Sequence, residues 1–265
     1  MMLLLKLTLA PLLVAAATLI TRRCGPKVGG LLMGLPLTTG PIFFFLATDQ
    51  GPRFAASTSV GILFGLIGLA AFAVVYAASS SWFGWVGSLG LAVAAFLAFS
   101  VAASRLGGDV VVAAFAAWAT LLLAASLIRK PRLGAAPPPP PPWWDLGVRM
   151  IAVAALILAT TAAAGRLGPV LSGIIGTYPV AITVVVTFIH VQLGRDVVAA
   201  MLRGSVLSWF GFASCFLTIG LLIERLGIVV SMSFGALAAV ATSVLVLWLD
   251  RVGALPSVPR MVQNL

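Results

Sequence analysis

Long apolar runs, separated by short polar stretches, occupy most of the chain. Each run has roughly the ~20 consecutive apolar residues that a helix needs to cross the hydrocarbon core of a bilayer. The pattern therefore predicts an all-α polytopic membrane protein with about nine transmembrane helices. The runs cover residues 4–20, 27–48, 55–78, 85–103, 109–128, 147–165, 170–193, 197–222 and 228–248.

The composition agrees with this interpretation. Of the 265 residues, 62% are hydrophobic and only 8% are charged, and the mean hydropathy is +1.18. A soluble globular domain has about 25% charged residues, and a soluble core of this size could not bury so much apolar surface. The net charge of +10 comes from residues that lie mainly between the apolar runs, where they set orientation in the membrane. Nucleic acid is therefore not an expected partner.

The second half of the sequence repeats the first with a constant difference in residue number, called the repeat offset below. Gly25–Pro36 aligns with Gly168–Pro179, and the difference is the same at both ends (168 − 25 = 179 − 36). The repeat offset also pairs, without a gap, Gly51 with Gly194, Gly61 with Gly204, Gly68 with Gly211 and Gly84 with Gly227. Each copy contains four apolar runs, so the sequence predicts an internal duplication.

The fifth apolar run lies between the two copies and decides their relative orientation. Four crossings return the chain to its starting side and the fifth carries it across, so the second copy begins on the opposite face. Such an inverted-topology repeat is common among secondary transporters. The predicted segments are repeat 1 at 1–105, a linker helix with a proline-rich cytoplasmic loop at 106–145, repeat 2 at 146–250 and a cytoplasmic tail at 251–265.

The distribution of Lys and Arg predicts the orientation in the membrane. Eleven of these residues lie on the side that contains the proline-rich loop and five on the other side, and cytoplasmic loops carry the excess of positive charge. The N-terminus is therefore expected outside and the C-terminus in the cytoplasm. The six prolines at 137–142 predict a stiff polyproline II spacer, and a docking segment for a PxxP-binding domain is the alternative.

A proline lies near the middle of the second run and of its counterpart, the seventh run. Pro36 and Pro179 each remove a backbone donor and free the carbonyl four residues earlier. Paired interruptions in inverted halves point to a transporter binding site; the alternative is two structural kinks, repaired by hydroxyls and neighbouring helices. The candidate substrate-binding residues are Pro36, Thr38, Thr39, Gly40, Pro41, Tyr178, Pro179, Thr183 and Thr187.

Ionisable residues near the ends of these runs are candidates for a gate or for coupling. Arg203 follows Asp196 by seven residues on nearly the same helical face, a spacing that allows an internal gate or an ion pair, but an arginine that snorkels to the headgroups is the preferred interpretation. His190 is a candidate proton relay or, alternatively, a structural histidine at the interface. The complete set is Asp49, Arg53, His190, Arg195, Asp196 and Arg203.

Small residues form a stripe on the third run of each copy. Their spacing of i, i+4 and i+7 places them on one helix face, where another backbone can approach closely. The expected partner is the broken helix beside the stripe. The stripe consists of Gly61, Gly65 and Gly68 in the first copy and Gly204, Ser208 and Gly211 in the second.

The usual catalytic, metal-binding and phosphate-binding motifs are absent from the sequence. Cys24 and Cys215 have no CxxC spacing, and His190 alone cannot build a zinc site. The chain is therefore not expected to be an enzyme or to hold a cofactor or a metal. Asp and Glu are absent from the depths of the apolar runs, which argues against proton or sodium coupling and favours a neutral, hydrophobic or anionic solute.

The shared pattern of Gly25–Pro36 and Gly168–Pro179, Gly-Pro-x-x-x-Gly followed by Pro six residues later, resembles that of uncharacterised bacterial integral membrane proteins. It is distantly similar to GlpM-type small membrane proteins, as if two copies were fused. The resemblance implies a bacterial inner-membrane location and says nothing of the substrate. The sequence favours a transporter of a small solute, with a non-transporting scaffold or assembly factor as the alternative. The expected partners are the lipid bilayer and the solute, and a homodimer is left open.

Overall fold

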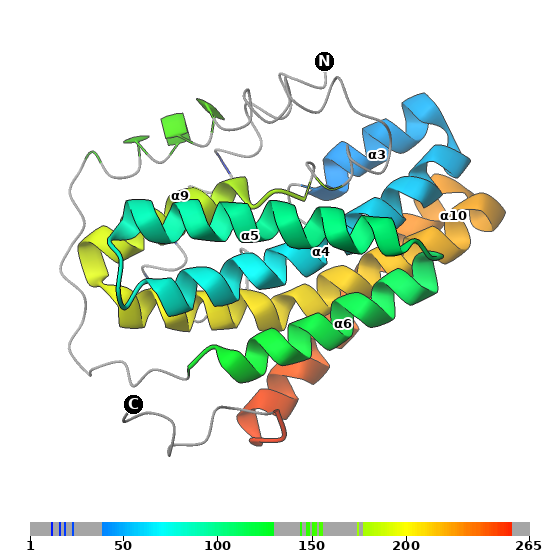
Figure 1. The fold of residues 1–265 in the computed structure, drawn as a ribbon. Coiled ribbons are helices and arrows are strands. Elements are labelled where there is room, and N and C mark those ends of the chain that lie inside the picture. Colours follow the sequence, from blue (N-terminus) through cyan, green and yellow to red (C-terminus); the bar gives the residue numbers. More distant parts are fainter. Residues whose placement is uncertain are drawn as a thin grey trace.

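The computed structural model describes two long stretches of the chain and a few residues outside them. These are residues 39–129 and 177–255, together with residues 12, 16, 19, 23, 144, 147, 148, 150–152, 154, 155 and 174. The apolar runs at 4–20 and 147–165, and parts of the runs at 27–48 and 170–193, therefore lie outside the two described stretches. The helices of the described part (Figure 1) are α3 (Thr39–Gln50), α4 (Pro52–Ser79), α5 (Trp85–Leu106), α6 (Val110–Leu127), α9 (Val180–Leu193) and α10 (Arg195–Arg251).

Four of these helices, α4, α5, α6 and α10, are long and apolar enough to cross a membrane. The 57 residues of α10 form two helices that meet at Gly227, whose φ of 76° and ψ of 175° are not helical. These two parts are called α10a (195–226) and α10b (228–251) below. Helix α9 is a shorter apolar helix. The chain is thus a helical membrane protein, as the apolar runs predict.

The core of the bundle is built around α4 and α10a, which lie side by side (Figure 1). Helix α4 contacts α3, α5, α6 and α10, and every residue from 201 to 216 is buried. An apolar helix that is buried on all sides belongs to the centre of a bundle. Helices α5 and α6 lie further out and expose large apolar side chains such as Leu97 and Phe115, which in a membrane face the lipid.

Helix α10a runs antiparallel to α6 and α4. A methyl group added at Gly220 would lie 2.6 Å from Cγ2 of Val110, at the start of α6, and 3.3 Å from Cβ of Ser59, in the first third of α4. Near the other end of α10a, Arg203 donates hydrogen bonds to carbonyls at the end of α6. The helix colours in Figure 1 show the same opposite directions for α4 and α10a.

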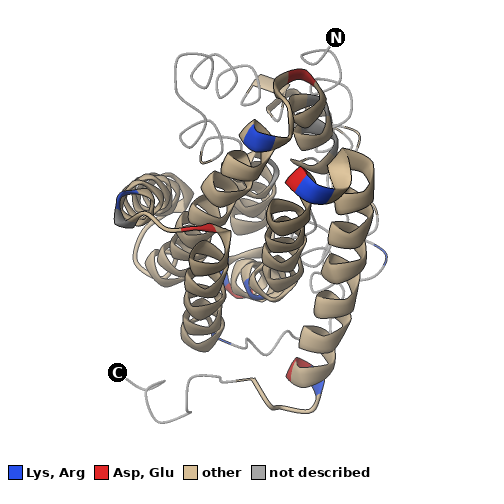
Figure 2. Cartoon of the chain, turned by 90° about the vertical axis from the view of Figure 1, so that its right-hand side faces the viewer, with Lys and Arg blue, Asp and Glu red and all other residues tan. Residues whose placement is uncertain are grey.

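Charged residues lie mainly at the ends of the described helices, and few lie within the spans; Figure 2 marks them on the cartoon. This distribution suits helices that cross a bilayer, because charge is expensive in hydrocarbon. Arg203 is the exception within the described part, since it is buried about two turns inside α10a. One end of the bundle carries Asp49, Arg53, Arg105, Asp109, Glu224 and Arg225, and the opposite end carries Arg129, Arg195, Asp196, Asp250 and Arg251.

Helix ends recur in the two halves at the repeat offset. Helix α3 ends at Gln50 and α9 at Leu193, while α4 begins at Pro52 and α10 at Arg195. One glycine joins α3 to α4 and another joins α9 to α10, and the two glycines have the same backbone conformation. Gly51 has φ 87° and ψ 169°, and Gly194 has φ 82° and ψ 175°. A positive φ of this kind is available to glycine without strain, so both turns require the residue that the repeat pairs.

The small-residue stripe also makes one close contact twice. A methyl group added at Gly68 would overlap Oγ of Ser100 on α5, and one added at Gly211 would overlap Oγ of Ser243 on α10b. The repeat offset also pairs Ser100 with Ser243, so the same two positions of each half touch. Absence of a side chain at these glycines lets the helices approach closely.

The expected partner of the stripe is correct at one position and wrong at others. Cβ of Thr177, just before the break at Pro179, lies 2.7 Å from a methyl group added at Gly65, as expected for packing on a broken helix. Gly68 and Gly211 instead pack on the helix that follows the stripe in their own half. Three residues along a helix rotate the side-chain direction enough to reach a different neighbour.

Candidate functional site

The chain is non-helical around Pro179, the second of the paired prolines. Helix α9 begins at Val180 with Pro179 as its N-cap, at φ −78° and ψ 61°. The N–H of Thr177 donates to the carbonyl of Ile174 at 3.1 Å, and the N–H of Val180 donates to the carbonyl of Tyr178 at 2.8 Å. These are turn hydrogen bonds rather than helical ones, so an interruption is present at the predicted position.

The first of the paired prolines lies outside the described residues. Pro36 and Thr38 both fall there, and so does any cavity between the two prolines. Thr39 and Gly40 are half-buried in the first turn of α3, and Pro41 follows them in the same helix.

The second break packs against the central helices. Thr177 is buried against Gly65 of α4, and the ring of Tyr178 meets that of Phe96 on α5 edge-on, with centroids 5.5 Å apart. Pro179 itself is buried. The break therefore lies in the bundle interior rather than at the lipid surface.

Polar side chains continue from the break along one face of α9. The Thr183 hydroxyl donates to the Tyr178 hydroxyl at 3.4 Å, and the Thr187 hydroxyl donates to the carbonyl of Thr183 at 2.8 Å. His190 follows three residues later, and spacings of four and three keep these residues on one helix face. The predicted residues Tyr178, Thr183 and Thr187 are thus arranged in one series, which also includes His190.

Tyr76 on α4 completes this series and was not among the predicted residues. Its hydroxyl lies 3.3 Å from Nδ1 of His190, within hydrogen-bond distance, and the two rings meet edge-on at 5.8 Å. The Thr187 side chain lies beside the same phenol. The sequence does carry one signal, because a buried tyrosine hydroxyl in an apolar helix needs a polar partner. His190 is half-buried and paired with Tyr76, about one turn before the end of α9.

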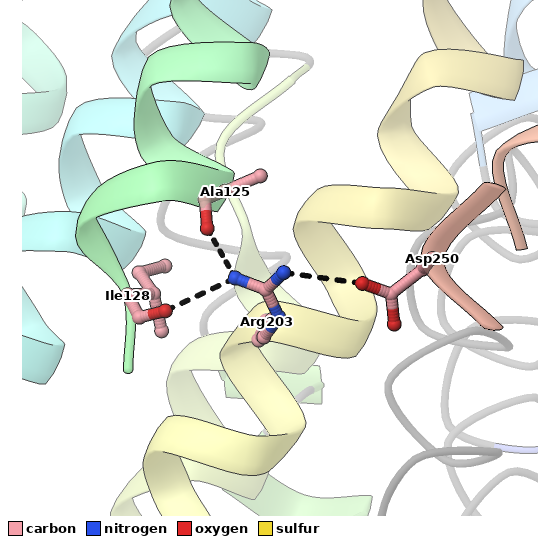
Figure 3. Close-up of polar contacts among 4 residues, drawn as sticks. All are labelled: Ala125, Ile128, Arg203 and Asp250. Atoms are coloured by element: carbon pink, nitrogen blue, oxygen red, sulfur yellow. Dashed lines mark hydrogen bonds and ion pairs between the residues drawn. The ribbon is translucent and has the colours of Figure 1, made fainter. Parts of the chain in front are cut away.

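Arg203 is 5% exposed and does not snorkel (Figure 3). One terminal nitrogen, NH1, donates to the carbonyls of Ala125 and Ile128, the latter at 3.1 Å. The other, NH2, donates to Oδ1 of Asp250 at 3.1 Å. An ion pair is present as expected for one of the two alternatives, but its acid is Asp250 on α10b and not Asp196.

The Arg203 contacts have a clear physical cause. The last carbonyls of a helix have no intrahelical donor, and the end of α6 carries the negative pole of its dipole. A guanidinium group presents several N–H donors in a fixed plane, so Arg203 can donate hydrogen bonds to these carbonyls and to the carboxylate at the same time. Arg203 thereby joins α10a, α6 and α10b at one end of the bundle.

The remaining gate candidates are exposed at helix ends. Asp49 and Arg53 flank the turn between α3 and α4, and Arg195 and Asp196 begin α10. The first pair lies at the end of the bundle opposite His190, and the second pair lies at the same end as His190. The structure therefore does not bring these four residues together into one site.

The polar side chains that follow the break are uncharged groups that can form hydrogen bonds with a ligand. Among the described residues, no group of three or more His, Cys, Asp or Glu side chains could hold a metal ion.

No protein-family model matches the chain, and neither curated proteins nor solved structures give a match. The resemblance to GlpM-type proteins therefore stays a prediction.

Proposed function

We propose that the protein is a membrane transporter that moves a small solute by alternating access around the helix breaks at Pro36 and Pro179. The observation that carries the proposal is the break at Pro179, buried beside the central helix α4 and followed by a series of hydroxyl side chains. A helix interruption inside a membrane bundle leaves backbone groups that only a protein or ligand partner can satisfy. Transporters use such groups to bind their substrates.

The proposal includes nine helices in two inverted four-helix repeats joined by α6. Helix ends and turn glycines that recur at the repeat offset support the duplication. The antiparallel pair α4 and α10a supports the inversion. Because Ser59 lies beside Gly220, counting nine residues along each helix brings Gly68 level with Gly211, its own counterpart. A two-fold axis between antiparallel helices that cross a membrane lies in the membrane plane.

The orientation proposed for the bacterial inner membrane has the N-terminus outside and the C-terminus in the cytoplasm. The end of the bundle with Arg129, Arg195 and Arg251 is then cytoplasmic, in accord with the excess of positive charge on that side.

A non-transporting scaffold or assembly factor is the alternative. The Arg203 cluster favours it, because one buried side chain ties α10a, α6 and α10b together and so opposes motion between them. A scaffold needs no solute flux, whereas a transporter does.

Purified protein in proteoliposomes is expected to carry out uptake of at least one member of a panel of neutral, anionic and hydrophobic solutes. The Pro36→Ala and Pro179→Ala variants are expected to keep their melting temperature and to lose at least about tenfold of this flux, since alanine lets the helix close over the break. Pro52→Ala is the matched control, because Pro52 occupies the first turn of α4, where proline removes no helical hydrogen bond.

Two results would contradict the transporter. Absence of flux for the whole panel in the parent protein would favour the scaffold. Flux that stays unchanged in both the Pro36 and the Pro179 variants would show that the breaks are structural kinks without a role in transport.

A further inference from the structure

One type of helix contact occurs twice in the bundle, once in each half. Tyr76 and His190 join α4 to α9, and Phe43 and Phe216 join α3 to α10a, with ring centroids 5.2 Å apart. At the repeat offset, the counterparts of the two phenylalanines fall within about one helical turn of His190 and Tyr76. The α4–α9 and α3–α10a interfaces are therefore the same interface at nearly the same register.

The chemistry of the two interfaces differs sharply. On the α4–α9 side it is polar and on the α3–α10a side it is apolar, although both sides are buried, with Tyr76 and Ala47 each 0% exposed. The corresponding residues are Tyr76 and Ile219, His190 and Ala47, Thr187 and Phe44, and Thr183 and Gly40.

Packing alone does not require the polar residues. The α3–α10a interface seals the same contact with aromatic and aliphatic side chains, and polar groups inside a membrane are unfavourable unless each finds a partner. Two contacts on the α4–α9 side are long for hydrogen bonds, whereas Thr187 donates to the carbonyl of Thr183 at the normal length of 2.8 Å. The Tyr76 hydroxyl lies 3.3 Å from Nδ1 of His190, and the Thr183 hydroxyl lies 3.4 Å from that of Tyr178, against about 2.7–3.0 Å for typical hydrogen bonds. The polar residues of this side therefore need an explanation other than packing.

We propose that an uncharged, hydrogen-bonding solute passes along the α4–α9 interface, between the break at Pro179 and the cytoplasmic end of the bundle. The residues that line this polar path are Tyr178, Thr183, Thr187, Tyr76 and His190. The α3–α10a interface is its apolar counterpart and seals the route to the opposite face. The inference rests on the proposed transport function and names the class of its substrate.

Hydroxyl and imidazole groups donate and accept hydrogen bonds, so the polar path matches alcohols, amides and similar neutral solutes. The described residues that line it carry neither a carboxylate nor a permanent cation, which would be needed to balance an ionic solute in a low-dielectric interior. Arg195 and Asp196 are exposed at the cytoplasmic end, where the path opens.

Cysteine accessibility tests the polar path without knowledge of the solute. In protein whose Cys24 and Cys215 are replaced by alanine, Thr187→Cys is expected to react with iodoacetamide, a small uncharged polar reagent, at least about tenfold faster than Phe44→Cys. Thr183→Cys, closer to the break, provides a second position. Ser81→Cys in an exposed turn is the fast control, and Leu97→Cys, 47% exposed in the middle of α5, where lipid would surround it, is the slow control.

Reactivity of Thr187→Cys and Thr183→Cys as slow as that of Phe44→Cys and Leu97→Cys would overturn the polar path. The outcome is separate from that of the flux experiment. Fast labelling without flux would keep a solute-accessible path and reject the transporter, and flux with unreactive cysteines would keep the transporter and reject this path.

Discussion

Replacing Arg203 by leucine is expected to lower the free energy of unfolding by about 3–5 kcal/mol, the usual effect of removing one partner of a buried ion pair. The change removes the donor that the carbonyls of Ala125 and Ile128 and the carboxylate of Asp250 share. For a chain of this length we expect a fall in melting temperature on the order of 10 °C, measured by tryptophan fluorescence in detergent.

Two variants make the Arg203 result specific. Arg225→Leu removes an exposed arginine from the same helix, and surface changes of this kind alter stability by roughly 0.5 kcal/mol or less. Arg203→Lys keeps the charge but loses the planar set of donors, so its melting temperature should fall between those of the parent and of Arg203→Leu. If Arg203→Leu has the same melting temperature as Arg225→Leu, the contacts of Arg203 do not hold the helices together.

Alanine at Gly68 is expected to destabilise the protein by about 1–3 kcal/mol, although alanine is the better helix former. The added methyl group would overlap Oγ of Ser100 and the carbonyl of Phe96 on α5. The backbone carbonyl cannot move aside as a flexible side chain would, so the helices must separate. Gly211→Ala meets Ser243 in the same way and should lower the melting temperature similarly.

Gly90→Ala is the control for these glycine variants. Gly90 is exposed on α5, and no atom would lie within 4 Å of its added methyl group. There alanine should raise stability by about 0.5–1 kcal/mol through its helix preference alone. A rise for Gly68→Ala equal to that for Gly90→Ala would show that α4 and α5 are not in close contact.

The positions of the helices could be predicted well from the sequence. The runs at 55–78, 85–103 and 109–128 correspond to α4, α5 and α6 with ends that differ by at most three residues. This success has a simple reason, because the length of an apolar run and the polar residues at its ends define a membrane span locally. The same holds for the interruption at Pro179, since proline acts on its own helix.

The partners of buried polar residues could not be predicted in the same way. Arg203 pairs with Asp250 instead of Asp196, and His190 meets Tyr76, which lies far earlier in the chain. Such contacts depend on how each helix is rotated about its axis. Apart from Arg203 and the charged residues at their ends, helices α4 and α10a are apolar on all sides, so their sequences contain no polar face from which that rotation can be deduced.

The opposite insertion of the two halves, on which the transport mechanism depends, can be tested with one pair of equivalent positions. Arg53 and Asp196 are both exposed, begin equivalent helices and are paired by the repeat offset. Each is replaced by cysteine in protein that lacks Cys24 and Cys215, and a membrane-impermeant maleimide is added to intact cells or to inverted vesicles. We expect Arg53→Cys to react only from outside and Asp196→Cys only from the cytoplasmic side, whereas labelling of both from the same side would contradict the inverted repeat.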